Sequence, residues 1–336
     1  MLMFRQILLL LLLTTLPPGA AAVQRPPEGS EFQLFIENDM LARTDRYYTN
    51  GIKFGGGMSF DLLQLPAAEV LRQIAPEASG KVHLGLFLGQ NLYTPRTITV
   101  SQAQPQDRPW AAWLYLGGVA QRTRDNRIDT VEVDLGLVGP SALGKEIHSG
   151  WHRLIGSPQP QGWHHQLPNE PAFLVSWMAK SKHELGNAAG LDIEAIPHGG
   201  ATVGTVMTLA RGGGLLRMGR NMTGFGPDTI EPGGAMLQNA RRELEPGRAQ
   251  RFEWYAFAGV DHRLVAHNIF LDGTVFRDSP SVRRRPHVYD LSLGLSVRYG
   301  ALRVSLTRVK RSEEFFTATS TGGRQTFDSV NLGLEF

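Results

Sequence analysis

Apolar and polar residues alternate with a period of two along much of this chain. Between Val131 and Leu137, apolar side chains alternate with Glu132, Asp134 and Gly136. Successive side chains of a β-strand point to opposite faces of the sheet. The pattern therefore predicts a strand with one apolar and one charged face.

A second alternating stretch, Tyr289–Tyr299, has an apolar face that begins and ends with tyrosine. Aromatic residues at both ends of an apolar strand face are typical of lipid-facing strands in outer-membrane barrels. A β-sandwich could show the same alternation, but its outer faces would be polar. The charged faces should therefore line the interior of a barrel, where we expect Glu132, Asp134, Asp290 and Arg303.

The complete pattern predicts an all-β fold, a closed antiparallel transmembrane β-barrel of about 12 strands, because single-chain bacterial barrels have an even strand number. The predicted strands are 31–37, 48–60, 81–92, 110–122, 127–138, 171–186, 190–200, 202–216, 251–261, 286–299, 300–311 and 325–336. Leu264–Leu271 is interpreted as an extension of the strand before it. The last strand stops on Phe336, like the C-terminal signal of bacterial outer-membrane barrels.

The first 22 residues, 1–22, have the features of a signal peptide: a basic start, an apolar run and a small-residue cleavage site. We therefore predict one outer-membrane β-barrel enzyme domain over 23–336. No other segment approaches the roughly 20 apolar residues that a membrane helix needs. Cysteine is absent, which excludes a disulfide framework, and 34 Lys and Arg against 31 Asp and Glu do not favour a nucleic-acid partner.

One segment breaks the period-two pattern. Residues 141–155 follow Gly139-Pro140 and place apolar residues at helical spacing. His148 and His152 are four residues apart and so share one face. We predict a short amphipathic helix in an extracellular loop.

The order of strands predicts which loops lie together. If the N-terminus is periplasmic, the loops 38–47, 93–109 and 139–170 all face outward. The same scheme makes 61–80 and 217–250 periplasmic. Every candidate chemical group then lies at one end of the barrel.

The stretch Phe32–Gly51 carries the densest candidate chemistry. Asp39 and Asp45, with an amide from Asn38 and a hydroxyl from Thr49, converge where two strands meet a loop. Oxygen ligands of this kind suit a hard cation such as Ca²⁺. An acidic, well-capped hairpin loop without a cation is the alternative interpretation.

His152 is the best candidate for a general base, because an imidazole titrates near neutral pH. A lone histidine on a helix is more often structural. His148 could join it in binding a metal, but two histidines at this spacing are a weak zinc signal without a third ligand.

These residues together resemble a known family. Asn38-Asp39, Tyr48-Thr49-x-Gly51, Tyr93-x-Pro95, Gly139-Pro140 before a helix with His152, and Gln166-x-x-Asn169 are similar to motifs of the calcium-dependent lipid A 3'-O-deacylases of the LpxR type. The resemblance implies a twelve-stranded outer-membrane barrel that hydrolyses the 3'-linked acyl ester of lipid A. It also implies a histidine acting on water, with Ca²⁺ at the oxyanion.

Carried over by position, the resemblance implies that His152 is the base and Asp39 the carboxylate that binds the metal, with Asn38 and Thr49 completing the catalytic site. The loops would bind lipopolysaccharide, and the expected substrate-binding residues are Arg46, Arg96, Arg108 and Gln166. Two departures stand out. The loop after the third strand lacks the family's adjacent Lys-Arg pair, and His148 replaces a glutamine.

Two other classes of function stay open at this point. An outer-membrane phospholipase-like esterase would share the barrel and the cation but needs a serine nucleophile, and no serine here is convincingly placed beside a base. A non-catalytic pore or adhesin would need neither Ca²⁺ nor His152. Bulky candidates for the lumen, such as Tyr255 and Phe257, argue against an open channel. The sequence does not define the oligomeric state.

Overall fold

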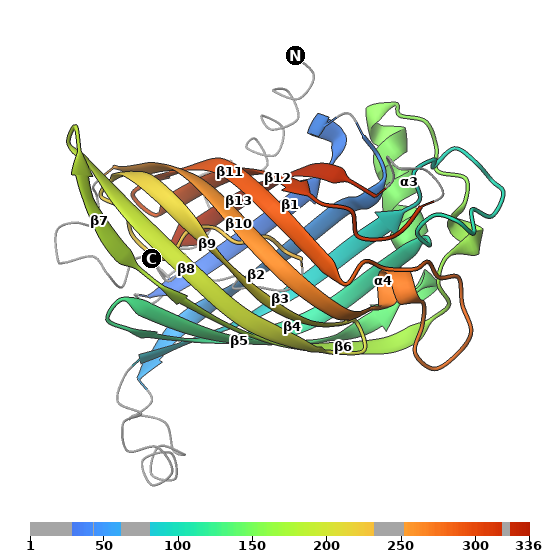
Figure 1. Cartoon of the computed structure of the whole chain (residues 1–336), viewed down its shortest axis with the longest axis horizontal. Helices are drawn as coiled ribbons and strands as arrows, with labels where there is room; N and C mark the ends of the chain where they lie inside the picture. The colour runs from blue at the N-terminus through green and yellow to red at the C-terminus, as the bar shows by residue number, and fades with distance from the viewer. Residues whose placement is uncertain (1–28, 43, 62–80, 232–251, 318–322) are drawn as a thin grey trace, which may run out of the picture.

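The computed structural model describes residues 29–42, 44–61, 81–231, 252–317 and 323–336. Their strands form one antiparallel sheet (Figure 1). The strands are β1 (Ser30–Asn38), β2 (Tyr47–Asp61), β3 (Lys81–Thr94), β4 (Ala111–Arg124), β5 (Arg127–Val138), β6 (Glu170–Ser181), β7 (His183–Ala188), β8 (Leu191–Gly204), β9 (Met207–Arg220), β10 (Glu253–Asn268), β11 (His287–Tyr299), β12 (Leu302–Arg311) and β13 (Gln325–Glu335). The helices are η1 (Met40–Ala42), η3 (Pro140–Ala142), α3 (Gly144–Ile155), η4 (Trp163–His165) and α4 (Ile269–Asp272).

The sheet closes into a barrel. β1 pairs with β13, and β6 pairs with β8, so every strand except β7 has two neighbours. The short β7 pairs with the first half of β8 and extends beyond the closed part. Removing β7 from the thirteen strands leaves twelve, which confirms the predicted architecture.

Two predicted strand boundaries were wrong, and one predicted extension was confirmed in part. The expected strand 171–186 ends at Ser181, and β7 is a separate strand after it. The turn expected near residue 201 lies instead after Gly204, because the alternation of β8 continues through glycines that hide the strand end. Leu264–Leu271 extends β10 as far as Asn268 and then forms α4.

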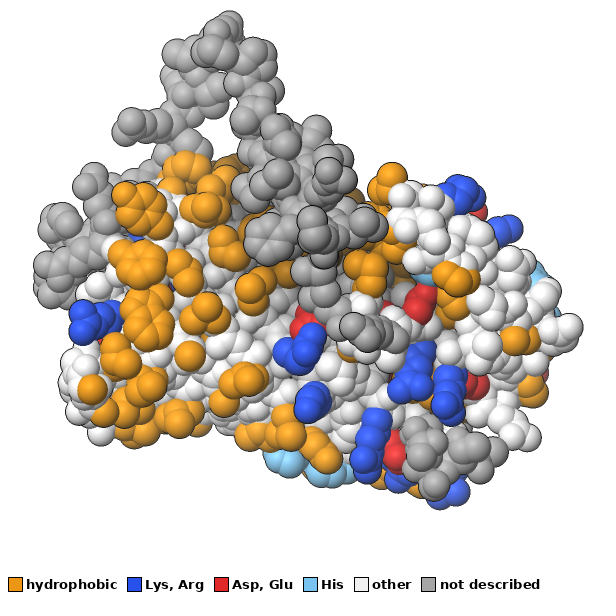
Figure 2. Space-filling model, turned by 90° about the horizontal axis from the view of Figure 1, so that it is seen from above, with side chains coloured by type: hydrophobic (Ala, Val, Ile, Leu, Met, Phe, Trp, Pro, Cys, Tyr) orange, Lys and Arg blue, Asp and Glu red, His pale blue; other side chains and the backbone are white. Residues whose placement is uncertain are grey.

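The two faces of the barrel wall have opposite character, as the alternation predicted. On β5, Leu135 is 62% exposed, whereas Glu132 and Asp134 are buried inside. Tyr289 and Tyr299, at the ends of β11, are both exposed outward. Figure 2 shows hydrophobic side chains spread over the strand region. An apolar outer face of this kind faces lipid.

The lumen is filled by buried ion pairs. Arg303 contacts Glu253 at 2.7 Å and Glu335 at 2.8 Å, and Lys53 contacts Glu132 at 2.7 Å. Buried charges are tolerated only when they are paired and hydrogen-bonded. The predicted lumen residues Tyr255 and Phe257 are buried here too.

A segment after β9, residues 221–231, also enters the lumen. Asp228 contacts Lys180 at 2.6 Å, and Glu231 contacts Arg311 at 2.9 Å. The backbone N–H of Ile230 donates to Glu37 at 2.9 Å. The described part of the long connection 217–250 therefore fills the barrel.

The helices η1, α3 and α4 lie at one end of the barrel, opposite to β7 (Figure 1). The loops 38–47, 93–109 and 139–170 therefore lie at the same end of the barrel, as the order of the strands predicted. Among the described helices, none has both the length and the apolarity to cross a membrane. The predicted signal peptide, 1–22, and residues 62–80 of the predicted periplasmic loop lie outside the described residues.

Candidate functional site

The loop between β1 and β2 is held together by Asn38 and Asp39. The Asn38 amide donates to the backbone carbonyl of Thr49 at 3.1 Å, and its side-chain oxygen accepts from Met40 N–H at 2.7 Å. The Asp39 carboxylate accepts from the Thr44 hydroxyl and the Arg46 backbone N–H, each at 2.9 Å. Asp39 is fully buried. Both residues therefore shape this loop.

Thr49 lies at an irregularity in the pairing of β2 with β3. The register shifts between Tyr48 and Asn50, which is a β-bulge, and the buried Thr49 hydroxyl is hydrogen-bonded to that of Thr94 at 2.7 Å. Bulges redirect side chains and are common beside active sites.

Close packing fixes α3 against the barrel end. A side chain on Gly144 would come within 2.5 Å of Ala112 and 2.7 Å of Trp163, so only glycine allows this approach. The Gln90 amide donates to the carbonyl of Ala142 at 2.6 Å. This packing turns His148 and His152 inward, and both are buried.

Asp45 joins the loop to the helix. One carboxylate oxygen lies 3.1 Å from His152 Nε2, and the other lies 3.4 Å from His148 Nε2. The candidate ligand atoms of the three residues all lie within 4.8 Å of one another. A carboxylate with two imidazoles is a donor set that could hold a zinc-like ion.

Hydrogen bonds distinguish the two histidines. The Trp163 indole, which can only donate, donates to His148 Nδ1 at 3.2 Å. His148 must then carry its proton on Nε2, so it faces Asp45 as a donor rather than as a metal ligand. His152 has the opposite arrangement, because its Nδ1–H donates to the Pro158 carbonyl at 2.5 Å and leaves Nε2 to exchange protons.

The electrostatics favour a charged His152. Burial alone would lower the pKa of His152, but hydrogen bonds with Asp45 and Pro158 and the charges of Asp45 and Asp39 outweigh it, so this pKa is raised. Burial would raise the pKa of Asp45, and its bonds to the two imidazoles instead lower it to about 2. Asp39 differs, because burial and the neighbouring Asp45 charge raise its pKa to about 7.

The four predicted substrate-binding residues lie in different environments. Arg46 is half-buried with its guanidinium 5.3 Å from the centre of the Tyr47 ring, and Arg96 is exposed. Arg108 is fully buried and donates to Glu314 at 3.1 Å. The Gln166 side-chain oxygen is buried without a hydrogen-bond partner in the described structure. Within the described residues, no hydrogen bond or ion pair joins any of the four to His152, and their role in binding stays a prediction.

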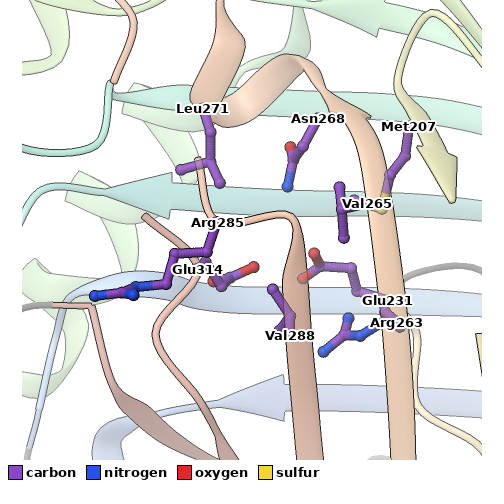
Figure 3. Close-up of a pocket in the computed structure, with 9 residues that line it drawn as sticks. All are labelled: Met207, Glu231, Arg263, Val265, Asn268, Leu271, Arg285, Val288 and Glu314. Atoms are coloured by element: carbon purple, nitrogen blue, oxygen red, sulfur yellow. The ribbon is translucent and has the colours of Figure 1, made fainter. Parts of the chain in front are cut away.

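A small cavity lies beneath the loops, inside the barrel (Figure 3). Its polar lining includes Glu231, Arg263 and Glu314, with Asn268 at the start of α4. It contains none of the predicted site residues. The candidate site is therefore the junction of α3 with the β1–β2 loop and not this cavity.

Asp45 is the site residue whose role the sequence did not define. Its carboxylate was visible beside Asp39, but nothing in the sequence pairs it with His148 and His152. Asp45 lies in the β1–β2 loop, and both histidines lie on α3, so the two loops that supply these residues are far apart in the chain. The one available signal was the order of the strands, which predicted that loops 38–47 and 139–170 lie at the same end of the barrel.

The fold and this junction define a class of protein: an outer-membrane β-barrel with a histidine and carboxylate site at one end. The family described as outer membrane protein LpxR matches residues 7–336. The chain therefore belongs to the LpxR family.

The fold agrees with that of a solved LpxR structure. LpxR from Salmonella typhimurium is 21% identical, with a TM-score of 0.70, over 91% of this chain and 100% of that one. The β domain of the Bordetella autotransporter BrkA is 10% identical, with a TM-score of 0.44, over 92% of this chain and 99% of that one. No curated protein sequence matches this chain.

Proposed function

We propose that this protein is a lipid A 3'-O-deacylase, a hydrolase that removes the 3'-linked acyl chain of lipopolysaccharide. The observation that carries the proposal is the orientation of His152. Pro158 holds its Nδ1–H, and its Nε2 lies 3.1 Å from the Asp45 carboxylate in the β1–β2 loop. An outer-membrane barrel with a general base at its loop end suits hydrolysis of a lipid ester.

The proposed base acts through Nε2. A water molecule in reach of Nε2 gives up its proton as its oxygen attacks the ester carbonyl. The bond from the carbonyl carbon to the sugar oxygen then breaks, and that oxygen takes the proton back from His152, which is an imidazolium between the two steps. Asp45, 3.1 Å away, stabilises that charge, which agrees with the raised pKa of His152. His148 donates toward the other oxygen of Asp45 and so positions this carboxylate.

Asp39 is the residue that would hold a calcium ion. It is a buried carboxylate that accepts hydrogen bonds from Thr44 and from the Arg46 backbone N–H. Burial and the neighbouring Asp45 charge raise its pKa to about 7, and a bound cation would offset both effects. Calcium prefers oxygen donors, whereas the group around Asp45 includes two ring nitrogens. Bound Ca²⁺ would supply charge stabilisation for the oxyanion, of order several kcal/mol. In this proposal Asn38 and Thr49 shape the site around Asp39.

The outer face of α3 supports access from the lipid side. The helix and its N-cap expose four apolar side chains away from the histidines: Leu143, Ile147, Trp151 and Leu154. Leu154 is 75% exposed. An acyl chain of the outer leaflet could pack on this face while its ester reaches His152, so we place the site toward the outer leaflet.

The test is mass spectrometry of lipid A incubated with the purified, detergent-solubilised protein, with Ca²⁺ or with a chelator. We expect calcium-dependent loss of the 3'-acyl group. His152→Ala should lose about 10²–10⁴-fold in rate, the usual contribution of a general base. His164→Ala is the matched control, because His164 is exposed and its ring packs on the neighbouring His165.

Four results would count against this proposal. Intact lipid A in both samples would exclude the reaction, and turnover of phospholipid in the same assay would favour the esterase alternative. Substantial turnover by His152→Ala would exclude the proposed base. Ion conductance would favour a pore, which the buried ion pairs of the lumen argue against.

A further inference from the structure

Two loops at the same end of the barrel are joined by backbone pairing. Arg284, in the β10–β11 loop, forms an antiparallel bridge with Phe315, in the β12–β13 loop. The N–H of Phe316 donates to the Arg283 carbonyl at 2.9 Å, and the N–H of Arg285 donates to the Glu314 carbonyl at 2.7 Å. The pairing fixes three consecutive arginines beside Phe316.

Two of these arginines pack on one aromatic ring. The guanidinium carbons of Arg283 and Arg285 lie 4.4 Å and 4.2 Å from the centre of the Phe316 ring. Phe316 itself is 38% exposed. A guanidinium that rests on an aromatic face keeps its N–H donors at its edges. The ring therefore holds two planar sets of donors in place at the surface.

The cluster has more positive than negative charge. Glu313 contacts Arg285, and it lies 3.8 Å from Arg324 Nε, which is 78% exposed. Arg283 is exposed and has no carboxylate partner among the described residues. Three guanidiniums thus share one carboxylate. Lys and Arg side chains also gather toward this end of the molecule in Figure 2.

The cluster adjoins the candidate active site. The Phe315 ring packs edge-on against Tyr47, with the ring centres 5.3 Å apart. Tyr47 in turn carries the guanidinium of Arg46 at 5.3 Å, and Arg46 follows Asp45 in the chain. Arg108, in the β3–β4 loop, differs from the arginines of this cluster because it is buried against Glu314.

We propose that Arg283, Arg285 and Arg324 form a phosphate-binding exosite that holds the phosphorylated headgroup of a glycolipid beside the candidate active site. Guanidiniums bind phosphate oxygens through charge-assisted and often paired hydrogen bonds. The identification of the lipid as lipid A rests on the proposed function. The proposal that this site binds phosphate does not depend on the proposed function.

The test measures binding without turnover, in the full chain carrying His152→Ala. Affinity is compared for lipid A with its phosphates, for the same lipid without them, and for phosphatidylglycerol, all in one detergent. Arg283→Ala with Arg285→Ala should weaken binding of the phosphorylated lipid A about tenfold or more. Arg308→Ala is the control, because Arg308 is a similarly exposed guanidinium, paired with Asp328 on the barrel wall.

Arg283→Gln alone keeps the contact of Arg285 with Glu313 and should give a smaller loss in a stably folded protein. A loss confined to the phosphorylated lipid A supports the exosite as proposed. An equal loss for phosphatidylglycerol supports a phosphate site and assigns phospholipid as its source. Unchanged binding, or the same loss for phosphate-free lipid A, overturns the exosite. Because no hydrolysis is measured, failure of the proposed reaction would appear only in the mass-spectrometric assay.

Discussion

Charged residues have opposite surroundings in the lumen and at the loop end of this barrel. In the lumen, Arg303 contacts two carboxylates, and Arg311 contacts both Asp290 and Glu231 at 2.9 Å. At the loop end, Asp45 faces imidazoles instead of guanidiniums. A guanidinium stays charged, whereas an imidazole can give or take a proton near neutral pH. Paired charge therefore supports structure in the lumen, whereas around Asp45 it supports acid–base chemistry.

The largest effect that would test this contrast is on stability. Arg303→Met should leave Glu253 and Glu335 without a shared partner in the lumen. Breaking a buried pair in this way costs about 3–5 kcal/mol of the free energy of unfolding. Urea unfolding in detergent or lipid would measure it.

Arg127→Met is the control for this experiment, because Arg127 is exposed and its ion pair with Asp129 lies at the surface. Its unfolding should match the wild type. A wild-type stability for Arg303→Met would show that the lumen does not depend on this network.

Asp45→Asn should change the pH dependence of activity. A general base must be neutral, so activity rises with pH through the pKa of His152. The substitution removes the hydrogen-bonded charge that raises this pKa and leaves burial, which lowers it. The acidic limb of kcat/KM should therefore move to lower pH, while the rate at high pH falls because the imidazolium is less stabilised.

The measurement is the pH–rate profile of Asp45→Asn. The control is the profile of Asp278→Asn, which changes an exposed loop carboxylate. An acidic limb at the wild-type position in Asp45→Asn would mean that Asp45 does not set the pKa of the base.

The smallest expected effect concerns His148. His148→Gln keeps an N–H donor toward Asp45 and should retain activity within a few fold. His148→Ala removes the donor, and a hydrogen bond worth about 0.5–1.5 kcal/mol corresponds to a loss of about two- to tenfold. Zinc titration calorimetry of both variants gives a second readout. If His148 were a metal ligand, both substitutions would weaken zinc binding equally.

Much of the barrel could be predicted from the sequence alone. The alternation around Glu132 and between Tyr289 and Tyr299 defined which side chains face lipid, because strand geometry fixes that relation locally. The positions of β7 and of the β8–β9 turn could not be predicted, since glycine-rich strands carry little alternation. The family motifs indicated Asp39 and His152, and their catalytic roles remain proposals.

What the sequence by itself determined was the two-faced strand, the short helix and the pairing of His148 with His152 on one face. All of these follow from backbone periodicities that act over a few residues. Only the tertiary structure decided that Asp45 meets both histidines, that Trp163 and Pro158 give these histidines opposite proton positions, and that Arg283 and Arg285 pack on Phe316. The contacts of Asp45 and of the arginines join loops separated by whole strands, whereas Trp163 and Pro158 lie in the same loop as the histidines. Barrel closure and loop packing, rather than local pattern, bring all of these residues together.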